Sequence, residues 1–315
     1  METKLKIPAI ASLIPISTEK IQTALMIHRA QVVQHLAFLP IESQNVSTNI
    51  LDTIGLIEEF KLEQDLIIRE SRSQTYSSAV YENKTNKNII IPAATHLKGG
   101  MQNRGNNQTE ILGANDDEKY NVNCFEPGRG HGDTHFTEFQ DVPADIAKET
   151  MTKTQGYDGS WNIISDYTRL TKNGSALSDF NTSSEQDRAK YALNFETVNG
   201  QTGACIITKN LSMVEIFPTH NTFNIYQNRL IRGKLASLFY RIHKNQPSQL
   251  ILPSEVETKT NTMVTTIKEA IEQTINKAIK KHGLLIGRAR GTNKAIDIIL
   301  TDTETPQVAY IFGVW

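Results

Sequence analysis

Short clusters of β-favouring residues, separated by turn-forming Asn, Gly and Asp, run from Ser78 to Val122 and constrain the fold more than any other feature of the sequence. Val, Ile, Tyr and Thr suit a pleated strand, whereas Gly, Asn and Asp accept the backbone angles of tight turns. Connections this short join antiparallel neighbours, so the region is predicted to be an antiparallel sheet. The predicted strands are Ala79–Tyr81, Asn88–Ile91, Thr109–Leu112 and Tyr120–Cys124.

Apolar residues at helical spacing predict several amphipathic helices outside this region. They are placed from Ser17 or Thr18 to Val32, over Asn49–Phe60, after Asn221 or Thr222, and over Thr262–His282, with Gly283 as the C-cap of this long helix. Further strands are predicted at His35–Ile41, Leu66–Arg69, Gly203–Thr208 and Met213–Phe217, with a final hairpin of Ala295–Leu300 and Val308–Val314. Because the elements show no regular βαβ rhythm, the predicted fold class is α+β, mainly an antiparallel sheet with packed helices.

The predicted domain organisation is an N-terminal helical extension over residues 1–33, followed by a single α+β domain over residues 34–315. A Ser-, Asn- and Thr-rich stretch over residues 171–185 is predicted to be a surface loop, where this domain could be subdivided.

Charge and cysteine content exclude several classes of function. The 33 basic and 34 acidic side chains nearly cancel, so we expect no nucleic-acid partner. No apolar run reaches the roughly 18 to 20 residues that span a bilayer, so we expect no membrane partner. Two cysteines, Cys124 and Cys205, make neither a disulfide framework nor a zinc ribbon and fit a reducing compartment, which predicts a cytoplasmic protein.

A glycine pair followed by three large polar side chains, Gly99–Arg104, is the first candidate binding segment. Glycine allows positive φ or close backbone approach, and the planar fork of Arg104 suits a carboxylate or a phosphate. Two interpretations stay open. Either Gln102, Asn103 and Arg104 bind an anionic or nucleotide-like ligand, or they satisfy backbone carbonyls at a hairpin corner.

A Gly-rich loop with many titratable groups, Cys124–His135, is the second candidate. Cys124 is a candidate nucleophile with His131 or His135 as its base, and Glu126 with Asp133 is a candidate acid–base pair. His131, Asp133 and His135 are ligand types that zinc, nickel or iron would accept, although the flanking glycines disfavour the helix that a His-x3-His pair requires. Packing of Cys124, an ion pair of Glu126 with an arginine, and solvent-exposed histidines are the alternatives.

These two segments resemble a known family, the prokaryotic ADP-ribosylglycohydrolase-and-rhodanese-phosphatase-associated protein domain. The most specific blocks are Gly99–Arg104 and Val122–Arg129, and weaker similarity in outline extends over residues 34–314. The resemblance implies a ligand related to ADP-ribose or NAD, and it carries over no catalytic residues. This chain departs from the family pattern after Arg129, where Gly130 and the loop His131–His135 replace an aromatic residue that is usually Trp.

Three functions follow as hypotheses. In the first, a phosphate-bearing, nucleotide-like ligand such as an ADP-ribose or NAD derivative binds to Gln102, Asn103, Arg104, Glu126 and Arg129, with or without catalysis. In the second, the protein is a noncatalytic structural or interaction protein, whose polar patch braces two β elements. In the third, the His131–His135 loop serves a metal-dependent hydrolase.

Overall fold

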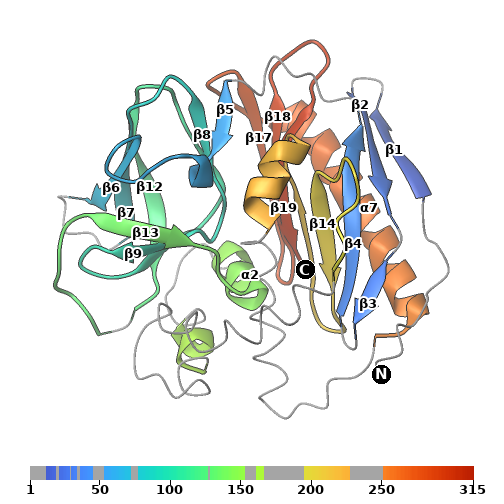
Figure 1. Ribbon diagram of the computed structural model, residues 1–315, viewed down its shortest axis with the longest axis horizontal. Coiled ribbons are helices and arrows are strands. Elements are labelled where there is room, and N and C mark those ends of the chain that lie inside the picture. Colours follow the sequence, from blue (N-terminus) through green and yellow to red (C-terminus); the bar gives the residue numbers. More distant parts are fainter. Residues whose placement is uncertain are drawn as a thin grey trace. The chain divides into compact units, whose positions relative to one another are not determined.

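The computed structural model describes residues 12–18, 21–28, 30–33, 36–44, 53–71, 77–126, 128–152, 161–166, 195–227 and 251–315 (Figure 1). The chain divides into two compact units. Unit 1 is formed by Met1–Leu51, Tyr191–Gln227 and Pro247–Trp315, and unit 2 by Asp52–Lys190 and Asn228–Gln246. Each unit has its own sheets and its own apolar core.

Unit 1 is built on one ten-stranded antiparallel sheet. β18 (Ala295–Thr301) and β19 (Val308–Val314) are buried at every position, as expected for central strands that are covered on both faces. β3 (Gln31–Val33) pairs with β4 (Leu36–Gln44) beside β2 (Ile21–Ile27). The other strands follow in the order β1 (Ser12–Thr18), β2 (Ile21–Ile27), β4 (Leu36–Gln44), β14 (Gly203–Ile207), β15 (Ser212–Ile216), β19 (Val308–Val314), β18 (Ala295–Thr301), β17 (Leu284–Arg290) and β16 (Ile279–Lys281).

The long helix α7 (Pro253–Lys277) packs across one face of this sheet (Figure 1). Pro253 suits the first helical position, and the Glu255 carboxylate accepts a hydrogen bond from the Leu252 N–H at 2.8 Å, which satisfies a free helix donor. Its apolar stripe includes Val256, Met263 and Ile267, all buried against the strands. The stripe therefore serves the core of unit 1.

Unit 2 contains a six-stranded antiparallel sheet that closes on itself. Its order is β13 (Phe136–Gln140), β9 (His96–Gly99), β10 (Arg104–Asn106), β12 (Asp117–Cys124), β7 (Ser78–Asn83) and β6 (Leu66–Glu70). An antiparallel bridge between Arg69 and His135 joins β6 to the residue that precedes β13. Because the first and last strands are connected in this way, the sheet is a small barrel.

A second sheet and three short helical segments complete the described part of unit 2. The sheet has the order β11 (Glu110–Leu112), β8 (Asn88–Ile91) and β5 (Ile54–Leu56), and β5 pairs with β8 in parallel. The 3₁₀ helix η1 (Ile57–Glu59) follows β5, and α2 (Ala144–Thr152) follows β13. Residues 161–166 form a further short helical segment.

The predicted α+β class, the antiparallel sheets and the long C-terminal helix followed by strands are confirmed. The predicted strands over residues 36–41 and 66–69 are confirmed, as are the pairing of β14 with β15 and the terminal hairpin of β18 and β19. Pro40 lies in β4 where the neighbouring strand changes from β2 to β3. Its carbonyl accepts the His28 N–H at 2.9 Å, so its missing N–H falls at the end of the pairing with β2. The predicted loop over residues 171–185 lies outside the described residues.

The predicted N-terminal helix is wrong, because Ser12–Thr18 and Ile21–Ile27 form a β-hairpin. The helix predicted over Asn49–Phe60 is also wrong in its described part, which consists of β5 and η1. α7 begins nine residues earlier than predicted and ends at Lys277. Gly283 therefore caps no helix; with His282 it forms the tight turn between β16 and β17, where both residues have positive φ. The predicted domain boundary after residue 33 falls between β3 and β4, which pair with each other.

Candidate functional site

One end of the unit 2 barrel contains polar side chains at positions that face inward. Successive residues of a strand point to opposite faces, so Leu66, Ile68 and Glu70 of β6 share the buried face. On the facing strands, Arg104 is in register with Leu97 on one side and with Cys124 on the other. Strand alternation thus places two charged side chains inside a predominantly apolar barrel.

Arg104 forms a fully buried ion pair with Glu70. The Arg104 side chain has no exposed surface, and that of Glu70 is 4% exposed. Arg104 Nη2 donates to both carboxylate oxygens at 3.2 and 3.3 Å, and Nη1 donates to Gln102 Oε1 at 2.9 Å. The Met101 N–H also donates to Glu70 Oε1 at 3.1 Å. Each charge is thereby matched in a medium where an unpaired charge is costly.

The Cys124 thiol is buried beside this pair and donates to Gln102 Oε1. Burial raises the pKa of the Cys124 thiol, and the hydrogen bond that the sulfur makes with the Glu126 backbone and the positive charge of Arg104 oppose this shift only in part. The Trp161 indole N–H donates to the Cys124 carbonyl at 2.8 Å. A raised pKa disfavours the thiolate, so the environment does not activate Cys124 as a nucleophile.

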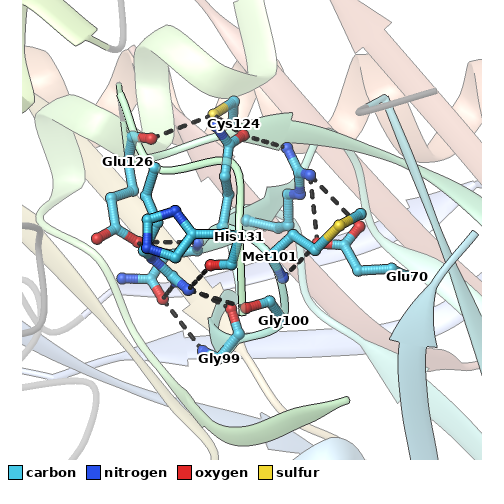
Figure 2. Close-up of polar contacts among 11 residues, drawn as sticks. Glu70, Gly99, Gly100, Met101, Cys124, Glu126 and His131 are labelled. Carbon is cyan, nitrogen blue, oxygen red and sulfur yellow. Dashed lines mark hydrogen bonds and ion pairs between the residues drawn. The ribbon is translucent and has the colours of Figure 1, made fainter. Parts of the chain in front are cut away.

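Arg129 forms a second layer, in which it binds the carbonyl groups of the glycine pair. Figure 2 shows this pair, Gly99 and Gly100, in one close-up with Glu70, Met101, Cys124, Glu126 and His131. Its Nε donates to Glu126 Oε2 at 2.7 Å, Nη1 donates to the Gly100 carbonyl at 2.9 Å, and Nη2 donates to the Gly99 carbonyl at 3.1 Å. Nη2 also reaches Asn103 Oδ1 at 3.3 Å. The guanidinium group therefore binds a turn of the backbone together with a carboxylate.

The two glycines are required by both backbone angle and space. Gly99 and Gly100 have φ values of 107° and 57°, which glycine adopts readily. A Cβ atom at Gly100 would lie 2.8 Å from the Phe136 ring and 2.9 Å from Glu70 Oε1. The Gly100 N–H donates to the His135 carbonyl at 2.8 Å, which ties the turn to the seam where the barrel closes.

The five residues predicted to bind a ligand lie in one hydrogen-bonded network. We call it the polar cluster, and it consists of Glu70, Gln102, Asn103, Arg104, Cys124, Glu126 and Arg129. Cys124 links its two layers, because its thiol contacts both Gln102 Oε1 and, at 3.7 Å, the Glu126 carbonyl. Within the second layer, the Asn103 N–H donates to Glu126 Oε2 at 3.2 Å. Glu70 was missing from the predicted set. The signal was present in the sequence, since a carboxylate at the third inward position of Leu66, Ile68 and Glu70 requires a buried partner.

The loop with His131, Asp133 and His135 is mostly exposed. The His131 backbone carbonyl accepts a hydrogen bond from Arg129 Nη1 at 3.3 Å, and the His131 ring makes no hydrogen bond with the described residues. Asp133 Oδ1 accepts the His135 N–H at 3.1 Å and lies 3.4 Å from its Nδ1, and these hydrogen bonds lower the pKa of the exposed Asp133 carboxyl. Within the described residues, the three side chains do not converge as a group of metal ligands.

A buried histidine on β9 gives the barrel a pH-dependent stability. His96 is fully buried, and its Nδ1 accepts from Gln140 Nε2 at 2.9 Å. Burial, assisted by the positive charge of Lys98, lowers the pKa of His96 to about 3. The unfolded chain therefore binds this proton more readily than the folded chain between about pH 6.5 and pH 3.

We expect the His96 contribution to stability to be complete above pH 6.5 and to be lost as the pH falls. The loss in the free energy of unfolding between pH 7.5 and pH 5 should be about 2 kcal/mol. Urea unfolding of the wild type and of His96→Gln, measured across this range, checks the expectation. The difference in unfolding free energy between the two proteins should shrink by this amount at pH 5, and a constant difference would contradict the assigned titration.

The fold and the cluster define an α+β protein in which a closed β-barrel carries a buried polar network at one end. The chain belongs to the ARPP-1 family, the ARG and Rhodanese-Phosphatase-superfamily-associated Protein domain, whose model matches residues 24–292. The family resemblance seen in the sequence is confirmed. No curated protein and no solved structure gives a significant match to the chain. No helix in the described part of the chain is long and apolar enough to cross a bilayer.

Proposed function

We propose that this protein acts by binding a partner, without catalysis, and that the polar cluster braces the closed end of the unit 2 barrel. The observation that carries the proposal is the use of both guanidinium groups by the protein itself. Arg104 is fully buried on Glu70 and Gln102, and Arg129 donates through all three of its nitrogens to protein oxygens. Arginines that bind phosphate need N–H groups directed at the ligand.

Two further observations support a noncatalytic role. The raised pKa of Cys124 and the ion pairing of Glu126 give neither group the properties of a nucleophile or a general base. The family description also presents this domain as one associated with ARG and rhodanese-phosphatase proteins, which is consistent with an accessory protein.

A second candidate function is binding of an ADP-ribose or NAD derivative at the outer layer of the cluster. It is favoured by the exposure of the Glu126 and Arg129 side chains, 18% and 26%, which contrasts with the burial of Arg104. A ligand phosphate would replace the Glu126 carboxylate as the partner of Arg129.

Thermal unfolding with ligands and variants tests the two functions against each other. As a brace, Glu126→Ala should lower stability by roughly 1.5 to 3 kcal/mol, because it removes an acceptor for Arg129 and for the Asn103 N–H. Glu126→Gln should cost less, since it keeps the side-chain size and one acceptor. NAD and ADP-ribose should leave the wild-type melting temperature unchanged and should be recovered intact after incubation.

Two results would contradict the noncatalytic brace. A rise in melting temperature with ADP-ribose or NAD that disappears in Arg129→Ala would favour the second candidate. Turnover of either compound by the wild type, absent in Glu126→Gln, would show that the protein is an enzyme and would overturn the proposal.

A further inference from the structure

Two adjoining cavities lie between the flank of α7 and the face of the unit 1 sheet over β17 and β18. Their volumes are about 220 and 210 Å³, and Ala270, Gln273 and Ala289 line both of them. One reaches Lys277 at the end of α7, and the other reaches Lys294 in the turn between β17 and β18. Each is smaller than a typical ligand pocket of roughly 300 Å³ or more, so a ligand of ordinary size has to occupy both. We call the two halves together the α7 groove.

Strand alternation decides which side chains of β17 reach the α7 groove. Gly287 and Ala289 face α7, because a Cβ atom at Gly287 would lie 1.7 Å from a side-chain oxygen of the helix and Ala289 packs against the core beneath it. Arg288 and Arg290 therefore point toward the opposite face of the sheet. Arg290 pairs there with Asp297, and Arg288 also interacts with the protein, so neither guanidinium group is assigned to a ligand of the groove.

The available charge is one lysine at each end of the α7 groove. Lys277 and Lys294 are exposed, and neither ammonium group makes a hydrogen bond or an ion pair with the described residues. Glu269 provides the single carboxylate among the described residues that line the groove, and it borders the half that contains Lys294. Two positive charges that the described fold does not already use favour a ligand with an anionic group at each end.

Between the two lysines the α7 groove is mostly apolar. Ala270 and Ala289 line both halves, and Ile296 and the half-buried Trp315 ring line the second half. Gln273 is the one polar side chain shared by both halves, and it makes no hydrogen bond with the described residues. The groove follows α7 for about three turns, or roughly 16 Å. A compact anion would contact one end, whereas an elongated ligand with an apolar middle would contact both ends.

We propose that the α7 groove binds a small α,ω-dicarboxylate, in which a linear apolar spacer separates two carboxylates. Each carboxylate pairs with one of the two lysines, and the spacer covers Ala270 and Ala289. A single lysine at each end matches the one charge of a carboxylate better than the higher charge of a phosphate. The inference goes beyond the proposed brace, because it gives unit 1 a small-molecule ligand of its own.

Isothermal titration calorimetry with the full chain and linear dicarboxylates from glutarate to dodecanedioate tests the proposal. Affinity should pass through a maximum at one chain length, because both carboxylates must reach a lysine at the same time. The monocarboxylate of that length and the dimethyl ester of the best dicarboxylate are the ligand controls, and each should bind at least about tenfold more weakly. Added salt should weaken binding of the dicarboxylate.

Substitutions of the lysines assign the two ends of the ligand. Lys277→Met and Lys294→Met each remove one charge, and each should reduce the affinity for the best dicarboxylate to about that of the monocarboxylate. Glu269→Gln should strengthen binding, because it removes the carboxylate that borders the groove. Lys268→Met is the matched control and should change nothing, since Lys268 lies on α7 nine residues before Lys277 and is about half a turn around the helix from the groove.

The emission of Trp315 reports where the ligand binds. The chain has two tryptophans, so Trp161→Phe leaves Trp315 as the single one, and the best dicarboxylate should change its fluorescence. Unchanged emission in this variant, while calorimetry detects binding, would place the ligand elsewhere and overturn the proposal.

Three further results would contradict the dicarboxylate site. They are the absence of binding across the whole series, equal affinity for the monocarboxylate and the dicarboxylate, and affinity that is unaffected by loss of either lysine. Because Lys277 and Lys294 are exposed, their substitution should leave the melting temperature near that of the wild type, so misfolding does not account for lost binding. The lysine variants concern unit 1, whereas the brace is tested through residues of unit 2, so a failure of one inference is distinguishable from a failure of the other.

Discussion

Arg104→Met should destabilise unit 2 by about 3 to 5 kcal/mol, because it leaves the Glu70 carboxylate buried without its cation. Methionine keeps most of the side-chain length, so little of this loss comes from an empty cavity. Glu70→Gln should cause a loss of similar size, since the Arg104 guanidinium would then be the uncompensated buried charge. Chemical denaturation of each variant measures the effect.

The double variant Arg104→Met/Glu70→Leu separates pairing from burial. A buried ion pair that is replaced by apolar groups of similar volume often recovers most of the lost stability. We expect the double variant to be more stable than either single variant, which gives a large coupling energy between the two positions. Losses below 1 kcal/mol in both single variants would contradict the brace and would indicate an Arg104 side chain that is available to a ligand.

The two free cysteines report which unit is affected. Cys124 lies in unit 2 and Cys205 in unit 1, and both thiols are buried. Opening of the barrel should increase the labelling rate of Cys124 in Arg104→Met, with little change at Cys205. Equal acceleration at both cysteines would indicate global unfolding of the chain.

The sequence predicted β6, β7, β8, β11 and β12 of unit 2, because local composition and short turns are sufficient there, but it did not predict β5, β9, β10 or β13. It failed at Ile21–Ile27 for a physical reason. Ile21 and Leu25 are four residues apart, which fits a helix, yet Ile21, Thr23, Leu25 and Ile27 also alternate as a strand requires. A spacing of four satisfies both periods, and the pairing of this segment with β1 and β4 decides between them.

The candidate site was predicted only in part, because one of its residues is distant from the others in the sequence. Arg104, Glu126 and Arg129 are close together in the sequence and were recognised as one polar region. Glu70 is 34 residues from Arg104, and only closure of the barrel brings the two together. This single partner changes the interpretation of Arg104 from a ligand-binding group to a structural group, because its guanidinium is paired inside a core.

Gly105→Ala tests the packing that holds the polar cluster in place, and its expected effect is comparable to that of Arg104→Met. A Cβ atom at Gly105 would lie 1.9 Å from Cζ of Phe125, whose ring is fully buried and lies 5.8 Å from the His96 ring. Overpacking of a core typically costs 1 to 3 kcal/mol and more where nothing can shift, so we expect a loss of at least about 3 kcal/mol here.

The cost of Gly105→Ala should depend on Phe125, since the steric conflict is with this ring alone among the nearest atoms. Phe125→Leu on its own should destabilise the barrel by leaving a void, but the combination Gly105→Ala/Phe125→Leu should lose less than the sum of the two single changes. Gly291→Ala is the control, because the nearest atom to its added methyl is Cγ of the flexible Lys294 at 3.3 Å. If the two losses of stability are additive, the effect of Gly105→Ala originates in the backbone of β10 and not in its contact with Phe125. The non-additive losses that we expect would show that the Phe125 ring packs directly on Gly105. Because Phe125 lies between Cys124 and Glu126, this contact positions both layers of the polar cluster against β10.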